Sequence, residues 1–250
     1  MRAMILAAGL GTRLRPLTIH RPKALVTLAG RTLLEITLTR LRGIGVTEVI
    51  VNTHHHAEMI AEYLAANQNF GMRVEISSEL DLLDTGGGLK KAAPFFLEGP
   101  DALDKPFLLH NVDVLSSIDL SRMLEFHAEH AALATLAVQE RPTSRYLLFD
   151  ESGELCGRRT GLEGSPELVR AASAPQAYAF SGLHVVSPRI FAKMTEPGAF
   201  SIVDCYLRLA ALGENILAFR ADDSYWRDLG RPESIQQAER DVADNQIPEA

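Results

Sequence analysis

The first 140 residues alternate between short apolar runs and longer segments in which apolar residues recur every three or four positions. A short apolar run between polar residues predicts a buried β-strand, and the three-to-four spacing predicts an amphipathic helix. The predicted strands cover residues 4–8, 48–52, 72–76, 107–110 and 133–138, and the predicted helices cover residues 34–41, 57–66, 89–96 and 120–130. This alternation predicts an α/β fold, with a largely parallel sheet between two layers of helices.

The regular alternation ends near Arg141. Residues 149–155 resemble a hairpin turn, and residues 157–175 are rich in Gly, Ser and Pro, which favours loops. Further on, the pattern predicts strands at 178–186, 216–219 and 225–226, and helices at 203–212 and after Pro232. We therefore expect one domain over residues 1–244, in which residues 141–230 form an insertion that covers a core at 1–140 and returns to the sheet. Residues 245–250 read as a loose tail.

Composition narrows the class of protein. A chain of 250 residues, 46% hydrophobic and with a mean hydropathy of +0.01, suits a single soluble α/β domain. The formal net charge of −7 argues against broad nucleic-acid binding, which usually requires a basic surface. Cys156 and Cys205 are the only cysteines, which favours a reducing compartment. No apolar run approaches the ~20 residues that span a bilayer, and the first strand begins almost at Met1, so we expect a cytoplasmic monomer or homodimer without a membrane partner.

A glycine loop follows the first predicted strand directly. Gly9 and Gly11 allow a sharp turn and a close approach of the backbone to a ligand. Positive charge in the same stretch comes from Arg13, Arg15 and Lys23. A dinucleotide fingerprint needs a third glycine where this chain has Leu14, and a P-loop needs a Gly-Lys-Ser or Gly-Lys-Thr triplet that does not follow. The loop therefore predicts a different phosphate site, for a nucleotide or another phosphorylated compound; the alternative is a plain strand-to-helix turn.

Two aspartates are candidates for metal ligands. Asp113 follows the predicted strand at 107–110, and ligands of open α/β sheets gather at the carboxyl ends of strands. Mg²⁺ prefers oxygen ligands and shares its shell with phosphates, so Asp113 is our first candidate; the alternative is a turn aspartate that caps the helix after Ser116. Asp228, just before Gly230, is the candidate for the second carboxylate, and the alternative there is an Asx turn.

Other chemically active side chains have simpler explanations. The three adjacent histidines at 54–56 suggest zinc, but adjacent side chains in regular structure cannot all face one ion, so we expect them to begin a helix at the mouth of a cleft. We expect His127 and His130 on a helix surface, and Cys205 as a small packed residue. Residues 84–88, Asp-Thr-Gly-Gly-Gly, predict a polar turn.

Taken together, these segments resemble the sugar-1-phosphate nucleotidylyltransferases. The matching segments are residues 6–18, the Pro22-Lys23 pair, and residues 83–88, 109–114, 180–182 and 226–230. They follow one order over nearly the whole chain, and the loop at 6–18 is highly specific. The likeness is to the short, single-domain members near the N-acetylmuramate-1-phosphate uridylyltransferases and mannose-1-phosphate guanylyltransferases. It implies a Rossmann-like three-layer αβα sandwich with a mostly parallel mixed sheet, a nucleotide-binding core at 1–140 and a sugar-binding insertion at 141–230.

The resemblance also implies the roles of individual residues. Contacts to the nucleotide would come from Ala7, Ala8, Gly9, Gly11, Thr12, Arg13, Lys23, Asp84, Gly87 and Asn111. The sugar phosphate would be held by Gly182 and Arg145, and Mg²⁺ by Asp113 and Asp228. The catalytic residues would be Arg13, Lys23 and Asp113.

Three positions depart from the family pattern. Val112 stands where relatives usually have glycine, and Asp84 replaces a commoner glutamate. Larger relatives use a Glu-Lys-Pro segment against the sugar phosphate, whereas this chain has Glu140-Arg141-Pro142, so Arg141 or Arg145 is the candidate substitute for that lysine.

The implied reaction joins a sugar 1-phosphate to a nucleoside triphosphate, with Mg²⁺, and releases pyrophosphate. We favour UTP first and GTP second, with the sugar left open, in nucleotide-sugar biosynthesis for the cell envelope. A metal-dependent glycosyltransferase of related fold would instead consume the nucleotide sugar. A non-catalytic nucleotide-sensing domain would bind the nucleotide and turn nothing over.

Overall fold

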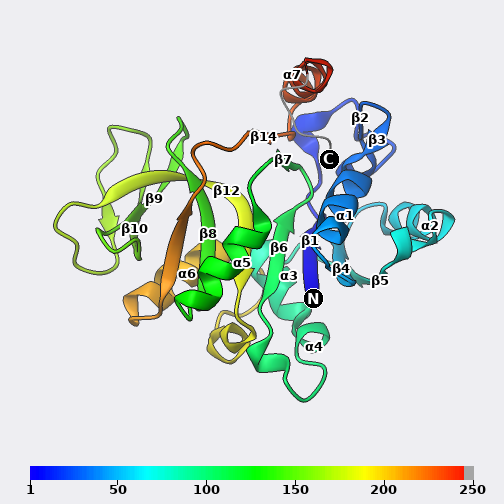
Figure 1. Cartoon of the computed structure of the whole chain (residues 1–250). Helices are drawn as coiled ribbons and strands as arrows, with labels where there is room; N and C mark the ends of the chain where they lie inside the picture. Colours follow the sequence, from blue (N-terminus) through cyan, green and yellow to red (C-terminus); the bar gives the residue numbers. More distant parts are fainter. Residues whose placement is uncertain (245–250) are drawn as a thin grey trace.

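The computed structural model describes residues 1–244, and a sheet of ten strands forms their centre (Figure 1). The strands are β1 (Arg2–Leu6), β4 (Glu48–Thr53), β5 (Arg73–Ser78), β6 (Phe107–Asn111), β8 (Ala134–Gln139), β9 (Arg145–Phe149), β10 (Leu155–Thr160), β11 (Glu167–Leu168), β12 (Gln176–Val186) and β13 (Ile216–Arg220). In the first half, β5, β4, β1 and β6 pair in parallel, as the alternating pattern predicts. In the second half, β13 is parallel to β8, while β12 runs antiparallel to β6, β8 and β9.

β1 shows how the sheet separates two layers of helices. Ala3 and Ile5 pack into one hydrophobic cluster and Met4 and Leu6 into the other, because successive side chains of a strand point to opposite faces. The helices that cover the first cluster are α1 (Leu33–Gly43), α2 (Ala57–Ala66), α5 (Leu120–Glu129) and α7 (Pro232–Ala243). Those that cover the second are α3 (Asp84–Lys91), α4 (Ala93–Phe96) and α6 (Ile202–Ala211). The three-layer αβα arrangement predicted from the sequence is confirmed.

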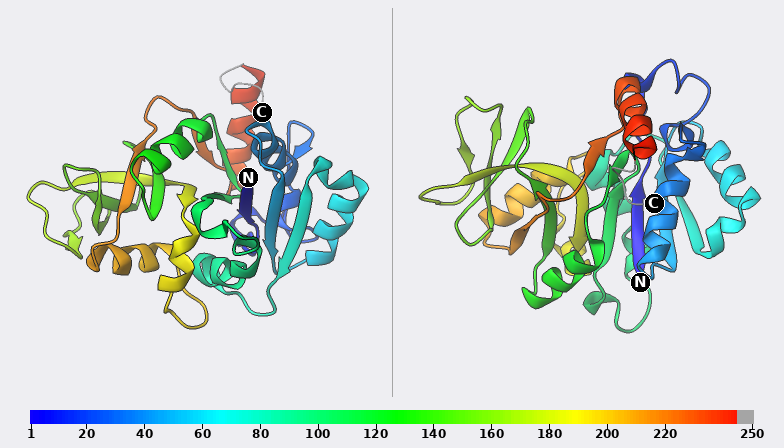
Figure 2. Two further views of the ribbon diagram at one scale, coloured as in Figure 1. Left: turned by 60° about the horizontal axis from the view of Figure 1, so that its bottom comes forward. Right: turned by 45° about the horizontal axis from the view of Figure 1, so that its top comes forward.

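The second half of the chain enters the same sheet. The C-terminal half of β12 pairs with β6 and its N-terminal half with β9, so one long strand joins the two halves. The outer strands β9, β10 and β11 extend away from β1 as a lobe (Figure 2). Residues 141–230 therefore extend the sheet as well as covering the core. The boundary near Arg141 stays a prediction, and the expected tail at 245–250 lies outside the described residues.

Residues 84–88 are helical, and the prediction of a polar turn there is wrong. They form the first part of α3, although glycine costs a helix up to about 1 kcal/mol relative to alanine. The reason is close packing: a Cβ added at Gly86 would overlap the Phe200 ring, and one at Gly87 would lie 2.7 Å from the Gly198 carbonyl oxygen. Tertiary packing therefore decides the conformation here, against local propensity.

His127 is buried, and the prediction of a surface position is wrong. Its side chain lies on the face of α5 that packs against β8, and its Nδ1 lies 2.9 Å from Thr135 Oγ1. Burial lowers the pKa of His127 to about 4. His130 is exposed and Cys205 is packed in the core, as predicted. The histidines at 54–56 precede α2, and His56 occupies its N-cap position, as predicted, but none of the three is among the residues that line the cleft described below.

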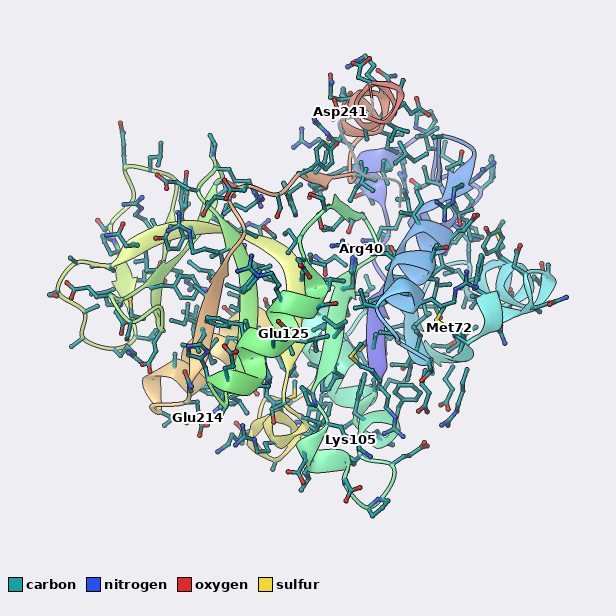
Figure 3. The ribbon with its side chains drawn as sticks, viewed as in Figure 1. Arg40, Met72, Lys105, Glu125, Glu214 and Asp241 are labelled. Atoms are coloured by element: carbon teal, nitrogen blue, oxygen red, sulfur yellow. The ribbon has the colours of Figure 1, made fainter. Side chains whose placement is uncertain are left out.

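Two small sheets lie beside the main one: β14 (Trp226–Asp228) pairs with β7 (Val114–Ser116), and β2 (Thr27–Leu28) with β3 (Arg31–Thr32). Asp241 of α7, labelled in Figure 3, accepts hydrogen bonds from Tyr225 Oη at 2.7 Å and Arg227 Nη2 at 2.7 Å. These bonds attach α7 to β14. Among residues 1–244, no helix has both the length and the apolar character to cross a membrane.

Candidate active site

A cleft of about 1080 Å³ opens at the carboxyl ends of the parallel strands. It begins beside Leu6 at the end of β1, Asn52 in β4 and Asn111 at the end of β6, and it continues between β9, β10, β12 and β14. Ligands of open α/β sheets are expected at this edge, so the topology alone makes it the candidate site. The sequence-predicted residues that line it are Ala8, Gly9, Arg13, Lys23, Asp84, Asn111, Asp113, Arg145, Gly182 and Asp228. Those that do not line it are Ala7, Gly11, Thr12 and Gly87.

The glycine loop folds back on itself before it reaches the cleft. Gly11 adopts a left-handed conformation with φ of 62°, which favours glycine, and its carbonyl oxygen accepts from Thr18 Oγ1 at 2.7 Å. The Lys23 side chain crosses over Gly9, where an added Cβ would lie 3.2 Å from Lys23 Nζ. The absence of a side chain at Gly9 thus leaves room for the lysine in the cleft.

Lys23 and Asp113 form an ion pair inside the cleft. Lys23 Nζ donates to Asp113 Oδ2 at 3.0 Å, and each side chain is 13% exposed. Burial alone would raise the pKa of Asp113, but the charge and hydrogen bond of Lys23, with a contribution from Arg13, hold that pKa below its ordinary value. Asp113 is therefore a carboxylate at neutral pH. It does not cap the following helix, because the N-cap of α5 is Asp119, which accepts from the Arg122 amide at 3.0 Å.

Asp228 reaches the same end of the cleft through β14. In the pairing of β14 with β7 it stands opposite Val114, and the Leu229 amide donates to the Asp113 carbonyl oxygen at 2.8 Å. Its Oδ1 accepts from the Gly230 amide at 2.6 Å, so the Asx turn considered for this residue is present. Arg13 is adjacent, because a Cβ at Gly230 would lie 2.6 Å from Asp228 Oδ1 and 2.9 Å from Arg13 Nη2.

The two carboxylates at this end of the cleft fit Mg²⁺. Asp113 and Asp228 offer carboxylate oxygens, the ligands this hard cation prefers, from two backbone segments that are hydrogen-bonded to each other. Residues 1–244 contain no cluster of three or more His, Cys, Asp or Glu side chains that could enclose a metal. Mg²⁺ usually binds through one or two carboxylates and completes its shell with water and substrate phosphates, so two ligands in an open cleft suit it.

A buried network beside the glycine loop was not predicted from the sequence. Asn52 Oδ1 accepts from the Ala7 amide at 2.7 Å, and Asn52 Nδ2 donates to Glu79 Oε1 at 2.8 Å. Glu79, only 4% exposed, also accepts from the Leu83 amide at 3.0 Å and lines the cleft. The network joins β1, β4 and the start of α3. Asn52 could have been found as a polar residue at the end of a predicted strand, whereas no sequence signal singles out Glu79.

The other half of the cleft contains an irregular part of β12. The pairing of β12 with β8 changes register between Phe180 and His184, and Gly182 within this stretch has φ of 73°. A Cβ there would lie 2.7 Å from Asn111 Nδ2, so the two predicted site residues are in contact across β12 and β6. Arg145, at the start of β9, is exposed at the cleft wall.

The cleft is rich in basic side chains although the chain carries a formal net charge of −7. They are Arg13, Lys23, Arg141, Arg145, Arg158 and Arg159. Arg158 is neutralised by Glu167 and Asp204, with Nε–Oε2 and Nη1–Oδ1 distances of 2.7 and 2.9 Å. Six carboxylates also line the cleft, and one of them, Asp113, pairs with Lys23. The cations without an ion pair among residues 1–244, which are therefore available to phosphates, are Arg13, Arg141, Arg145 and Arg159.

Comparison with known proteins identifies the family of this fold. The model of the nucleotidyl transferase family matches residues 2–245. The N-acetylmuramate alpha-1-phosphate uridylyltransferase of Caulobacter vibrioides is 34% identical, and the alignment covers 97% of each chain. The UTP–glucose-1-phosphate uridylyltransferase of Synechocystis and mannose-1-phosphate guanylyltransferase 1 of Arabidopsis thaliana are each 29% identical. Both alignments cover nearly all of this chain, 99% and 93%, but only 64% and 62% of those longer relatives.

Solved structures agree with the fold. A putative glucose-1-phosphate thymidylyltransferase from Bacillus anthracis superposes with a TM-score of 0.78 at 18% identity, covering 100% of this chain and 98% of its own. A UDP-glucose pyrophosphorylase complexed with UDP-glucose gives a TM-score of 0.77, also at 18% identity, with 98% of each chain covered.

Proposed function

Because the chain belongs to the nucleotidyl transferase family and is a sugar-1-phosphate nucleotidylyltransferase, we propose that it uses UTP and Mg²⁺ to make a UDP-sugar. One observation carries the proposal: Arg13, Lys23, Asp113 and Asp228 meet at one end of the cleft. Two cations and two carboxylates at the carboxyl ends of parallel strands match the needs of a metal-bound triphosphate.

The reaction needs alignment and charge neutralisation more than acid–base chemistry. An oxygen of the sugar phosphate attacks the α-phosphorus of UTP and forms a new P–O bond. The bond from the α-phosphorus to the oxygen that bridges to the β-phosphate breaks, and pyrophosphate leaves with that electron pair. The attacking phosphate is already an anion, so no general base is required. The protein must hold the two phosphates in line and stabilise charge on the departing pyrophosphate.

Different site residues would bind the metal and the triphosphate. Asp113 and Asp228 would hold Mg²⁺, which when bound supplies positive charge to the phosphate oxygens. Arg13, next to Asp228, and Lys23, next to Asp113, are positioned to bind the triphosphate from the side of the glycine loop. The ion pair with Asp113 keeps Lys23 in place before the nucleotide arrives, which reduces the reorganisation needed during the reaction.

UTP is our first choice of nucleotide because the relative aligned over 97% of both chains is named for uridylyl transfer, and GTP is second because guanylyltransferases are also similar. A screen of pyrophosphate release should cross UTP, GTP, dTTP, ATP and CTP with the 1-phosphates of N-acetylmuramate, glucose, mannose and a heptose. We expect the highest kcat/KM with UTP. Activity with no pair would contradict the proposal, and consumption of a UDP-sugar without pyrophosphate would support the glycosyltransferase alternative.

A further inference from the structure

Arg141 and Trp226 form a stacked pair on the wall of the cleft. The guanidinium carbon of Arg141 lies 3.4 Å from the centre of the Trp226 ring. Both side chains are half-buried, and both line the cleft. At this distance the guanidinium lies over the face of the indole, where cation–π attraction and dispersion hold it.

Backbone carbonyls of β12 fix each member of the pair. Arg141 Nη2 donates to the Phe180 carbonyl oxygen at 2.8 Å, and Trp226 Nε1 donates to the Ser181 carbonyl oxygen at 2.8 Å. These carbonyls lie in the stretch where β12 changes register against β8, next to Gly182. The irregularity in β12 therefore provides adjacent acceptors that orient the pair.

The charge of Arg141 is incompletely compensated. No carboxylate lies within ion-pair distance of it among residues 1–244, and its buried Nε has no hydrogen-bond partner there. Burial lowers the pKa of Arg141 to about 10, and the charge of Asp228 partly opposes that shift. A guanidinium removed from water without a contacting anion is costly, and a phosphate, which accepts two parallel N–H bonds, would compensate it.

The other arginines of this half are arranged differently. Arg158 is already paired with Glu167 and Asp204, whereas Arg145 is exposed and has no stacking partner within the described residues. Arg159 lies 5.4 Å from the centre of the Tyr146 ring, on the lobe formed by β9 and β10. Arg141 lies against Trp226, two residues from Asp228 on β14, which places it toward the proposed metal end of the cleft.

We propose that Trp226 is a positioning residue, which holds Arg141 beside Asp228 as the receptor for the phosphate of the sugar 1-phosphate. Trp226 and Asp228 are two residues apart on β14, so their side chains point to the same face of the strand. β14 then orients both Asp228, the proposed metal ligand, and Trp226, which supports Arg141. The inference rests on the proposed function, because it gives Arg141 the role of binding the attacking phosphate of the sugar 1-phosphate.

Steady-state kinetics test the role of the stack. Trp226→Leu removes the aromatic face, and we expect the KM for the sugar 1-phosphate to rise about tenfold while the KM for UTP changes little. Trp226→Phe keeps an aromatic face and should restore most of the affinity. Arg141→Lys keeps the charge but loses the planar stack, so it should resemble Trp226→Leu. Arg122→Lys, on the exposed side of α5, is the matched control and should behave as the unmodified protein.

A double-substitution cycle separates this role from general packing. If Trp226 acts through Arg141, adding Trp226→Leu to Arg141→Ala should change the KM for the sugar 1-phosphate by less than about twofold. Independent, multiplicative effects would overturn the proposal. Should Trp226→Leu fail to fold, Trp226→Met, which also removes the aromatic face, takes its place in the cycle.

Fluorescence gives a readout that does not depend on turnover, because Trp226 is the only tryptophan of the chain. With Mg²⁺ present, N-acetylmuramate 1-phosphate should change its emission, and Arg141→Ala should abolish the change. If no nucleotide–sugar pair turns over but this response remains, the proposed function fails and the assignment of Arg141 stands. If turnover is normal while the sugar 1-phosphate KM is unaffected by Trp226→Leu and Arg141→Lys, the assignment fails and the function stands.

Discussion

Lys23 Nζ and Asp113 Oδ2 are 3.0 Å apart in a part of the cleft where both side chains are 13% exposed. The pair joins the segment after the glycine loop to the turn after β6, and the charge and hydrogen bond of Lys23 lower the pKa of Asp113. The same carboxylate is the first candidate for binding the metal. Its removal should therefore affect catalysis far more than it affects the fold.

We expect Asp113→Ala to abolish measurable turnover, with a loss in kcat of at least about 10²-fold, because charge stabilisation of this kind contributes that much to phosphoryl and acyl transfer. The measurement is pyrophosphate release over a range of Mg²⁺ concentrations. Near wild-type activity at any Mg²⁺ concentration would remove Asp113 from the metal site. The matched control is Asp119→Ala: it deletes the N-cap of α5 and should cost about 1 kcal/mol of stability while leaving kcat unchanged.

The position of the site could be predicted from the sequence because its signals are local. A buried strand followed by Gly9 and Gly11 indicates a phosphate loop, and Asp113 follows another buried strand. Parallel pairing then brings the carboxyl ends of β1 and β6 to one edge of the sheet, which needs no further information from side chains. The sequence also made Asp228 a candidate for the second carboxylate, although its local sequence alone favours an Asx turn, and the resemblance to a family then supported the metal role.

The parts that could not be predicted depend on contacts between distant segments. The stack of Arg141 on Trp226 forms because β12 presents adjacent carbonyls at a register change, and no spacing in the sequence reports that event. The helical conformation of Gly87 also depends on a distant segment. Its local sequence favours a turn, and the glycine is explained only by the close packing of α3 against the Gly198 carbonyl oxygen. His127 lies on α5, and which face of α5 is buried depends on β8, a strand that comes later in the sequence.

Glu79 should influence the nucleotide more than the sugar phosphate. It supports Asn52, which in turn holds the Ala7 amide at the base of the glycine loop. Glu79→Gln weakens the acceptors for Asn52 and the Leu83 amide, and we expect a severalfold higher KM for UTP with a smaller change in the KM for the sugar 1-phosphate. Glu75→Gln, on β5 just before Glu79 but outside the cleft, is the control. Equal effects of the two substitutions on the KM for UTP would show that the network is not specific to the site.

Stability should fall in mild acid because of His127. Its pKa is lowered from 6.5 to about 4 in the folded protein, so between these pH values the unfolded state binds a proton that the folded state does not. Unfolding then becomes easier as the pH falls from 6.5 towards 4, by up to about 3 kcal/mol for this group. His127→Gln, which cannot be protonated, should flatten this part of the stability curve measured by urea unfolding. An unchanged slope between pH 6.5 and 4 would contradict the burial of a neutral imidazole.

Glycine-to-alanine substitutions in two helices should have opposite effects on stability. In α3, an alanine Cβ at Gly87 would lie 2.7 Å from the Gly198 carbonyl oxygen and 3.0 Å from Leu83 Cβ, so Gly87→Ala must move backbone and should destabilise by about 1–3 kcal/mol. In α1, nothing lies within 4 Å of a Cβ at Gly43, whose backbone is helical, so Gly43→Ala should stabilise by about 0.5–1 kcal/mol. Urea unfolding of both variants measures the difference directly. Stabilisation by Gly87→Ala would mean that α3 does not pack against the Gly198 segment as described, because helix propensity alone favours alanine at both positions.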